Sequence, residues 1–117
     1  MRNFRTLEIW QKAIILAKEI YQITSQFPDK ERFGLVSQLQ RAAVSVASNI
    51  AEGSARRSEV DFARFLEIAQ GSTFEIETQL IIAKEIGYIS TIQFEEFIKE
   101  LNILQKQINQ LISKIRG

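Results

Sequence analysis

Apolar residues recur every three or four positions along nearly the whole chain, which is the spacing of one face of a helix. Four segments carry this pattern, at about residues 5–26, 35–52, 58–86 and 91–115. Pro28, which cannot continue a helix, lies in the stretch between the first two. Short connections favour antiparallel neighbours. The pattern therefore predicts an all-α fold, an antiparallel up-down-up-down four-helix bundle that forms a single domain over residues 1–117.

Local signals indicate where these helices begin and end. Ser90 and Gln93 have the spacing of a capping box, and Ser58 with Asp61 resembles one, so each serine is predicted to precede a helix. Gly53 is predicted to be a left-handed cap after the second helix, and Gly87 to end the third.

Each predicted helix has one apolar seam that we assign to the core. In chain order the seams are Leu7, Trp10, Ile14, Ala17, Tyr21 and Thr24; Leu39, Ala42, Ala43, Val46 and Ile50; Phe62, Leu66, Ala69, Thr73, Ile76, Leu80 and Ala83; and Phe94, Phe97, Leu101, Leu104, Ile108, Leu111 and Ile115.

Further apolar residues lie outside these seams. The first helix has a second set, and the third and fourth helices carry others; they are Ile9, Leu16, Ile20, Ile23 and Phe27, then Phe65, Ile68, Phe74, Ile81 and Ile82, then Ile98 and Ile112. A monomeric bundle needs roughly three apolar positions in seven. The excess fits either a wide core with scattered exposed aliphatics or an interface between copies. We favour a homo-oligomer.

Composition excludes several classes of chemistry. The 117 residues are 45% hydrophobic and 25% charged, as in a soluble globular domain. The sequence has no Cys and no His, so disulfides, thiol nucleophiles, common zinc sites and His-based acid–base catalysis are absent. It also has no phosphate-loop motif and no apolar run of about 18 residues that could span a membrane. We expect a non-enzymatic cytoplasmic protein with no cofactor, no metal and no membrane contact.

Charge becomes informative once it is placed on the bundle. Fifteen Lys and Arg against fourteen Asp and Glu give a net charge of only +1. An antiparallel bundle, however, brings both chain termini and the connection between the second and third helices to one end. That end is predicted to collect seven bases, Arg2, Arg5, Arg56, Arg57, Arg64, Lys114 and Arg116, against four acids, Glu8, Glu52, Glu59 and Asp61.

This basic end has two interpretations. It is either a site for RNA or DNA phosphates, with Arg56 and Arg57 as first candidates, or a solubilising end whose charges pair internally. Aromatic residues are not interleaved with the bases, which favours phosphate contact over base stacking. Glu96 and Glu100, four apart on the fourth helix, are expected on the solvated surface rather than in a catalytic or metal site.

Three polar residues lie on or beside the apolar face of the second helix. Arg41, Asn49 and Glu52 are interpreted as a structural polar network, with a ligand site as the alternative. Glu52 would accept hydrogen bonds from Arg56 or the following loop, and Asn49 would bond across the bundle.

Several runs together resemble one protein family. They are Phe4 to Ala13, Phe33-Gly34-Leu35, SQLQRAAVSVASNIAEG from Ser37 to Gly53, Phe62 to Leu66, and Ala69 to Ser72. The chain resembles the bacterial four-helix-bundle proteins encoded by intervening sequences of 23S rRNA genes, which are similar to the accessory variability proteins of diversity-generating retroelements. The resemblance implies an up-down bundle, a homopentamer and proposed nucleic-acid binding. It places Arg41, Asn49, Glu52 and Gly53 in the signature stretch without making them catalytic.

Two functions remain open on the sequence alone. The first is a non-enzymatic oligomeric bundle whose basic end binds RNA or DNA phosphates. The alternative is a protein–protein adaptor or scaffold whose excess apolar faces dock a partner, such as a reverse transcriptase or a ribosomal component. Added salt distinguishes them, because phosphate binding weakens with salt and apolar docking survives it.

Overall fold

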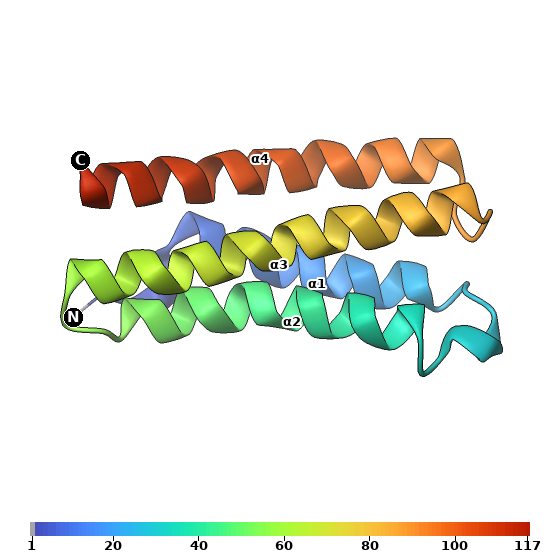
Figure 1. Ribbon diagram of the computed structural model, residues 1–117, viewed down its shortest axis with the longest axis horizontal. Coiled ribbons are helices and arrows are strands. Elements are labelled where there is room, and N and C mark those ends of the chain that lie inside the picture. The colour runs from blue at the N-terminus through green and yellow to red at the C-terminus, as the bar shows by residue number, and fades with distance from the viewer. Residues whose placement is uncertain (1) are drawn as a thin grey trace.

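Four long helices make up most of the computed structural model, which describes residues 2–117. They are α1 (Glu8–Thr24), α2 (Leu35–Ser54), α3 (Glu59–Glu85) and α4 (Thr91–Arg116), with short 3₁₀ turns η1 (Phe4–Thr6) and η2 (Asp29–Glu31). The helices alternate in direction, so both ends of the chain and the α2–α3 connection lie at one end of the molecule (Figure 1). The predicted all-α up-down-up-down bundle is confirmed.

The serine signals for helix starts are correct. Ser90 and Gln93 form a complete capping box before α4, with both reciprocal hydrogen bonds present. Ser58 Oγ accepts a hydrogen bond from the backbone N–H of Asp61 at 3.1 Å before α3. Gly87 follows α3 with φ at +85°, a conformation that a residue with a side chain rarely adopts.

The prediction for Gly53 is wrong, because α2 continues to Ser54 and Gly53 is a buried residue inside the helix. A Cβ atom added there would lie 2.6 Å from the Phe65 Cβ and 3.3 Å from the Phe62 carbonyl oxygen. Gly53 is therefore needed for the close approach of α3 to α2 and has no role in ending the helix.

The predicted core face of α1 is also wrong. The core uses the second apolar set together with Ala13, so that Ile9, Ala13, Leu16, Ile20, Ile23 and Phe27 are buried. Of the predicted seam only Thr24 is buried, whereas Ile14 and Tyr21 are 44% and 49% exposed. Both sets have helical spacing, so periodicity could not decide which of them faces the other three helices.

The predicted core seams of α2 and α3 are confirmed, and that of α4 is confirmed in its middle. Every predicted seam residue of α2 and α3 is buried. In α4 the middle of the seam, Leu101, Leu104 and Ile108, is buried together with Ile112. The ends of that seam are partly buried and pack against the core.

The four helix pairs are not equally close. α2 and α3 form the most extensive contact, and there the Ser72 hydroxyl donates to Ser45 Oγ at 2.9 Å. α1 and α4 form the least extensive contact of the four neighbouring pairs. Their polar links are near the ends, where Gln26 Nε2 donates to Gln93 Oε1 at 3.3 Å and Gln107 donates to Glu8 at 3.4 Å. One side of the bundle is therefore tightly packed and the opposite side is open.

Tyr88 joins the two connections at the far end of the bundle. Its ring packs against Phe27 at 5.3 Å between centroids, and its hydroxyl donates to Glu31 Oε2 at 2.7 Å. This hydrogen bond, together with one from the Leu35 N–H, holds the pKa of Glu31 below its ordinary value.

Candidate nucleic-acid interface

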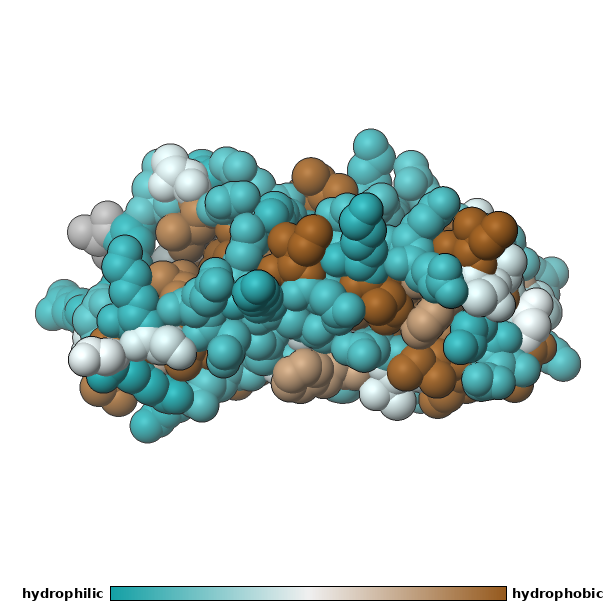
Figure 2. Space-filling view, turned by 90° about the horizontal axis from the view of Figure 1, so that it is seen from above, coloured by the Kyte–Doolittle hydropathy of each residue, from teal (hydrophilic) through white to brown (hydrophobic). Residues whose placement is uncertain are grey.

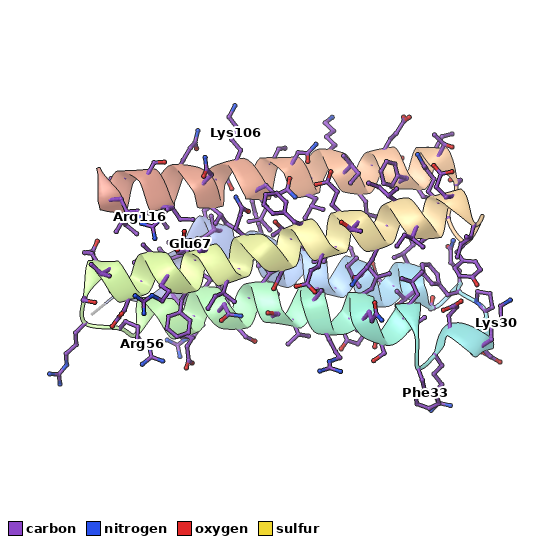
Figure 3. All side chains as sticks on the ribbon, viewed as in Figure 1. Lys30, Phe33, Arg56, Glu67, Lys106 and Arg116 are labelled. Atoms are coloured by element: carbon purple, nitrogen blue, oxygen red, sulfur yellow. The ribbon has the colours of Figure 1, made fainter. Side chains whose placement is uncertain are left out.

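The seven predicted basic residues come from three parts of the chain that the fold brings to one end. Arg2 and Arg5 lie before α1, while Arg56, Arg57 and Arg64 lie in the α2–α3 connection and the first turns of α3; Lys114 and Arg116 are in the last turn of α4. Figure 3 shows Arg56 and Arg116 at this end, away from Lys30 and Phe33 at the other. The predicted gathering of charge is present, but its members have different surroundings.

Arg2 is held by several groups of the protein itself. It forms an ion pair with Glu59, and it donates to the Arg56 carbonyl oxygen at 2.8 Å. Its guanidinium carbon lies 4.3 Å from the centroid of the Phe62 ring, and its side chain is only 24% exposed. Arg2 therefore fastens the N-terminal segment to the α2–α3 connection and is a poor candidate for a first phosphate contact.

Arg116 and Arg56 also have acidic partners. Arg116 makes two hydrogen bonds to the Glu67 carboxylate, at 2.8 and 3.0 Å, and the two side chains point toward each other in Figure 3. The pair lowers the pKa of Glu67 and raises that of Arg116. Arg56 pairs with Glu52 at 3.1 Å and lies over the Phe65 ring. Because Glu67 belongs to this end, the expected four acids become five, and seven bases leave a local balance of +2.

Four exposed bases of this end form no ion pair with any residue between 2 and 117. We call Arg5, Arg57, Arg64 and Lys114 the free cations. Arg5 contacts only neutral groups, the Asn3 side-chain oxygen at 3.4 Å and the Phe4 ring at 4.5 Å, so its charge is not compensated. The free cations are the part of the basic end that can neutralise phosphates without first breaking an ion pair.

An open hollow lies beside the α2–α3 connection. It has a volume of about 570 Å³ and is lined by Arg2, Ala55, Arg56, Arg57 and Glu59. Of its three arginines, only Arg57 has no acidic partner in the described chain. A phosphate in this hollow would find one free guanidinium and two others already engaged.

The expected polar network on α2 does not form as one unit. Glu52 accepts a hydrogen bond from Arg56, as predicted, but Glu52 and Arg41 are both exposed. Asn49 does not bond across the bundle; its amide donates to the Ser45 carbonyl oxygen at 2.8 Å and to Ser45 Oγ at 3.0 Å. The link to α3 is made instead by Ser45 and Ser72. The rotation of α2 in the bundle turns positions 41 and 52 outward, which spacing alone did not indicate.

A feature that the sequence did not reveal lies between α1 and α4. Glu19 of α1 and Glu96 and Glu100 of α4 line the same open seam. Glu96 and Glu100 are exposed, as expected, but their proximity to Glu19 joins residues from the first and last helices. No local pattern carries that signal, because it depends on which helices become neighbours.

Residues 2–117 contain neither a metal-binding cluster nor a membrane-spanning helix. No group of three or more acidic side chains there is placed to hold a metal ion. None of the helices in that range is long and apolar enough to cross a membrane.

Comparison with known proteins gives one family. The family model described as 23S rRNA-intervening sequence protein matches residues 5–110. Among solved structures, the chain is similar to a protein of unknown function from the S23 ribosomal protein family of Bacteroides thetaiotaomicron VPI-5482. The two share 26% sequence identity with a TM-score of 0.78, over 93% of this chain and 99% of the other. No curated protein matches the chain.

Proposed function

This chain belongs to the family of 23S rRNA-intervening sequence proteins, and on that premise we propose that it is a non-enzymatic, self-associating helical bundle that binds nucleic-acid phosphates through its basic end. The observation that carries the proposal is the gathering of the free cations, from three separate chain segments, at one end of the bundle. A net charge of +1 gives the whole molecule no general attraction to nucleic acid. The attraction has to come from this local set.

The contacts at this end support phosphate binding without base recognition. The rings of Phe62 and Phe65, the aromatic side chains of early α3, are each covered by an arginine of the same chain. Stacking of bases on them would require those arginines to move. Binding through cations alone is sequence-independent and weakens steeply with salt.

Self-association would multiply this charge if the basic ends of several copies face the same way. The proposal is supported by the outer face of α1, where Trp10, Ile14, Ala17 and Tyr21 keep the spacing of a helix–helix seam yet lie partly or largely outside the core. A homopentamer is the assembly that the family resemblance implies. Replacing Ile14 and Tyr21 by Glu is expected to lower the mass measured by light scattering to that of one 13.5 kDa chain. An unchanged mass would place the interface elsewhere or contradict self-association.

Charge reversal of three free cations tests the nucleic-acid proposal. The triple variant Arg57→Glu, Arg64→Glu, Lys114→Glu is expected to weaken binding of a generic single-stranded RNA at least tenfold at low salt. Loss of three phosphate contacts should also reduce the slope of log K against log salt by about 2. Fluorescence anisotropy at four or five salt concentrations measures both quantities.

A matched control has the same change in net charge. Lys30→Glu, Arg32→Glu, Lys106→Glu reverses three exposed bases that do not belong to the basic end, and Figure 3 shows Lys106 directed away from the bundle. The control should retain most of the RNA binding. Equal losses in the two variants would mean that only net charge matters, and unchanged binding in the first would remove the basic end as the site.

A protein–protein adaptor is the second candidate function. It is supported by large hydrophobic side chains exposed on several helices, among them Val60, Phe74 and Ile92 at 69%, 54% and 70%. Partner binding that persists at 0.5–1 M salt, roughly where exposed charges more than 3–4 Å apart are screened, would favour this function.

A further inference from the structure

A groove runs along the open seam between α1 and α4. Three adjoining hollows, of about 150, 270 and 310 Å³, share Glu19 as a lining residue. Along α1 and the turn after it the lining extends from Lys12 to Gln26, and on α4 it extends from Gln93 to Leu104. The twelve residues of α4 from Gln93 to Leu104 rise about 17 Å, so the groove is long enough for a helix of about three turns.

The floor of the groove is apolar. Leu16, Ile23, Leu101 and Leu104 are buried side chains that line the hollows. Ile15, 56% exposed, stands at the edge of the same groove. Figure 2, viewed from the α4 side, shows patches of hydrophobic atoms among hydrophilic ones on the face that α4 presents. Such a floor can take the apolar side chains of one face of a helix.

The edges of the groove are acidic. Glu19, Glu96 and Glu100 line it, and none of them forms an ion pair with a residue of the described chain. The groove also contains Lys12, which pairs with Glu8 at 3.3 Å, and Lys99. Among the residues that line the groove, three carboxylates without an ion pair face one lysine without an ion pair, Lys99.

Glu19 is in an unfavourable position for a charged carboxylate. Its partial burial raises its pKa above the ordinary value, and the negative charge of Glu100 raises it further, against a smaller opposite effect of Lys18. A cation placed between Glu19 and Glu100 would relieve this repulsion. The groove therefore offers a gain in free energy to an incoming positive charge.

We propose that the α1–α4 groove binds a basic amphipathic helix of a partner protein, with apolar residues three and four apart on the floor and Lys or Arg against Glu19, Glu96 and Glu100. Nucleic acid is not suited to this groove, because phosphates would meet the three carboxylates. The outer face of α1 from a second copy of the chain is also a poor match for this groove, because Lys18 is the only base among the exposed residues of α1. This groove is separate from the basic end. Its carboxylates make binding of a basic helix sensitive to salt, unlike docking through exposed apolar side chains alone.

The probe is a fluorescein-labelled 18-residue helical peptide with Leu at every third or fourth position and Lys beside them. A second peptide carries Glu in place of Lys, and a third has the first composition in scrambled order. Anisotropy is measured with the full chain, with the triple variant Glu19→Gln, Glu96→Gln, Glu100→Gln, and with Ile15→Lys. All four substituted side chains are partly or fully exposed, so the helices should form in each variant.

The first peptide should bind, the other two should bind at least tenfold more weakly, and both groove variants should lose at least tenfold in affinity. The matched controls are Glu75→Gln, Glu85→Gln, Glu95→Gln, three exposed carboxylates outside the groove, and Ile82→Lys, which replaces an isoleucine that is 46% exposed on α3. Both controls should bind the peptide as the unchanged chain does.

Three outcomes would overturn the proposal: equal binding of the Lys and Glu peptides, equal losses in groove and control variants, or a light-scattering mass that falls for Ile15→Lys but not for Ile82→Lys. The last would mean that a second copy of the chain covers the groove. The triple variant at Arg57, Arg64 and Lys114 should bind the peptide normally. Failure of RNA binding and failure of peptide binding are therefore separate results.

Discussion

The α2–α3 pair and the α1–α4 pair belong to one bundle but differ in how closely their helices pack. α2 and α3 meet through small residues, among them Gly53, Ser45 and Ser72, which allow close approach. α1 and α4 meet through long side chains and leave hollows edged by carboxylates. We infer that the α2–α3 side contributes more to stability, whereas the α1–α4 side carries the groove that we propose as a partner surface.

Truncation of one buried leucine in the α2–α3 pair and one in the α1–α4 pair should change the free energy of unfolding more than any other substitution considered. Leu39 of α2 is fully buried, and Leu104 of α4 is 1% exposed but lines the groove. Leu39→Ala should lower the free energy of unfolding by about 4 kcal/mol, and Leu104→Ala by about 2.5 kcal/mol, because the site beside an existing hollow has fewer contacts to lose and can be filled by solvent. Urea unfolding followed by circular dichroism measures both. Equal losses would mean that the α1–α4 seam is as tightly packed as the other side.

Two helical glycines test the close approach directly. Gly53→Ala should destabilise the protein by about 1–3 kcal/mol, since its Cβ would clash with the Phe65 Cβ, an atom attached to the backbone. Gly71→Ala is at an exposed position of α3, and no atom beyond its own stretch of helix lies within 4 Å of the added Cβ, so it should stabilise the protein by about 0.5–1 kcal/mol. Thermal unfolding of the two variants gives the comparison. A stabilising Gly53→Ala would show that the helices can separate at no cost.

Two glutamates with opposite pKa shifts give the smallest effect. The pKa of Glu19 in the groove is raised above 4.5, so its contribution to stability is present below the unfolded pKa and is lost as pH rises through the folded pKa. The pKa of Glu31 is lowered, so its contribution is present above the unfolded pKa and is lost as pH falls through the folded pKa. Glu19→Gln should therefore raise stability near pH 7 by a few tenths of a kcal/mol, and Tyr88→Phe should weaken the acid-side dependence that comes from Glu31.

Urea midpoints between pH 3 and 7 measure both dependences, with NMR titration of the two carboxyl groups as the direct readout. Glu75→Gln serves as the control, because Glu75 is exposed and forms no ion pair within the described chain. A pKa for Glu19 at or below the ordinary value would contradict the repulsion attributed to Glu100.

Much of the basic end could be predicted from the sequence, because topology alone brings the termini and the α2–α3 connection together. Which of its bases lack an acidic partner could not be predicted. Arg2, Arg56 and Arg116 pair with Glu59, Glu52 and Glu67. Two of these pairs join segments far apart in the sequence: Arg2–Glu59 joins the N-terminal segment to α3, and Arg116–Glu67 joins α4 to α3. Such pairs depend on the rotation and offset of neighbouring helices, which residue counts do not contain. The free cations therefore emerge only after the ion pairs are known.

The sequence by itself determined the four helices, the caps at Ser58 and Ser90, and the buried faces of α2 and α3. These features depend on local hydrogen bonds and on a single dominant apolar stripe, and both are properties of neighbouring residues. Only the tertiary structure decided which stripe of α1 is buried, why Gly53 is a glycine, and that Glu19 lies near Glu100. Each of these depends on the distance and rotation between helices that are far apart along the chain, and many side chains set that packing together.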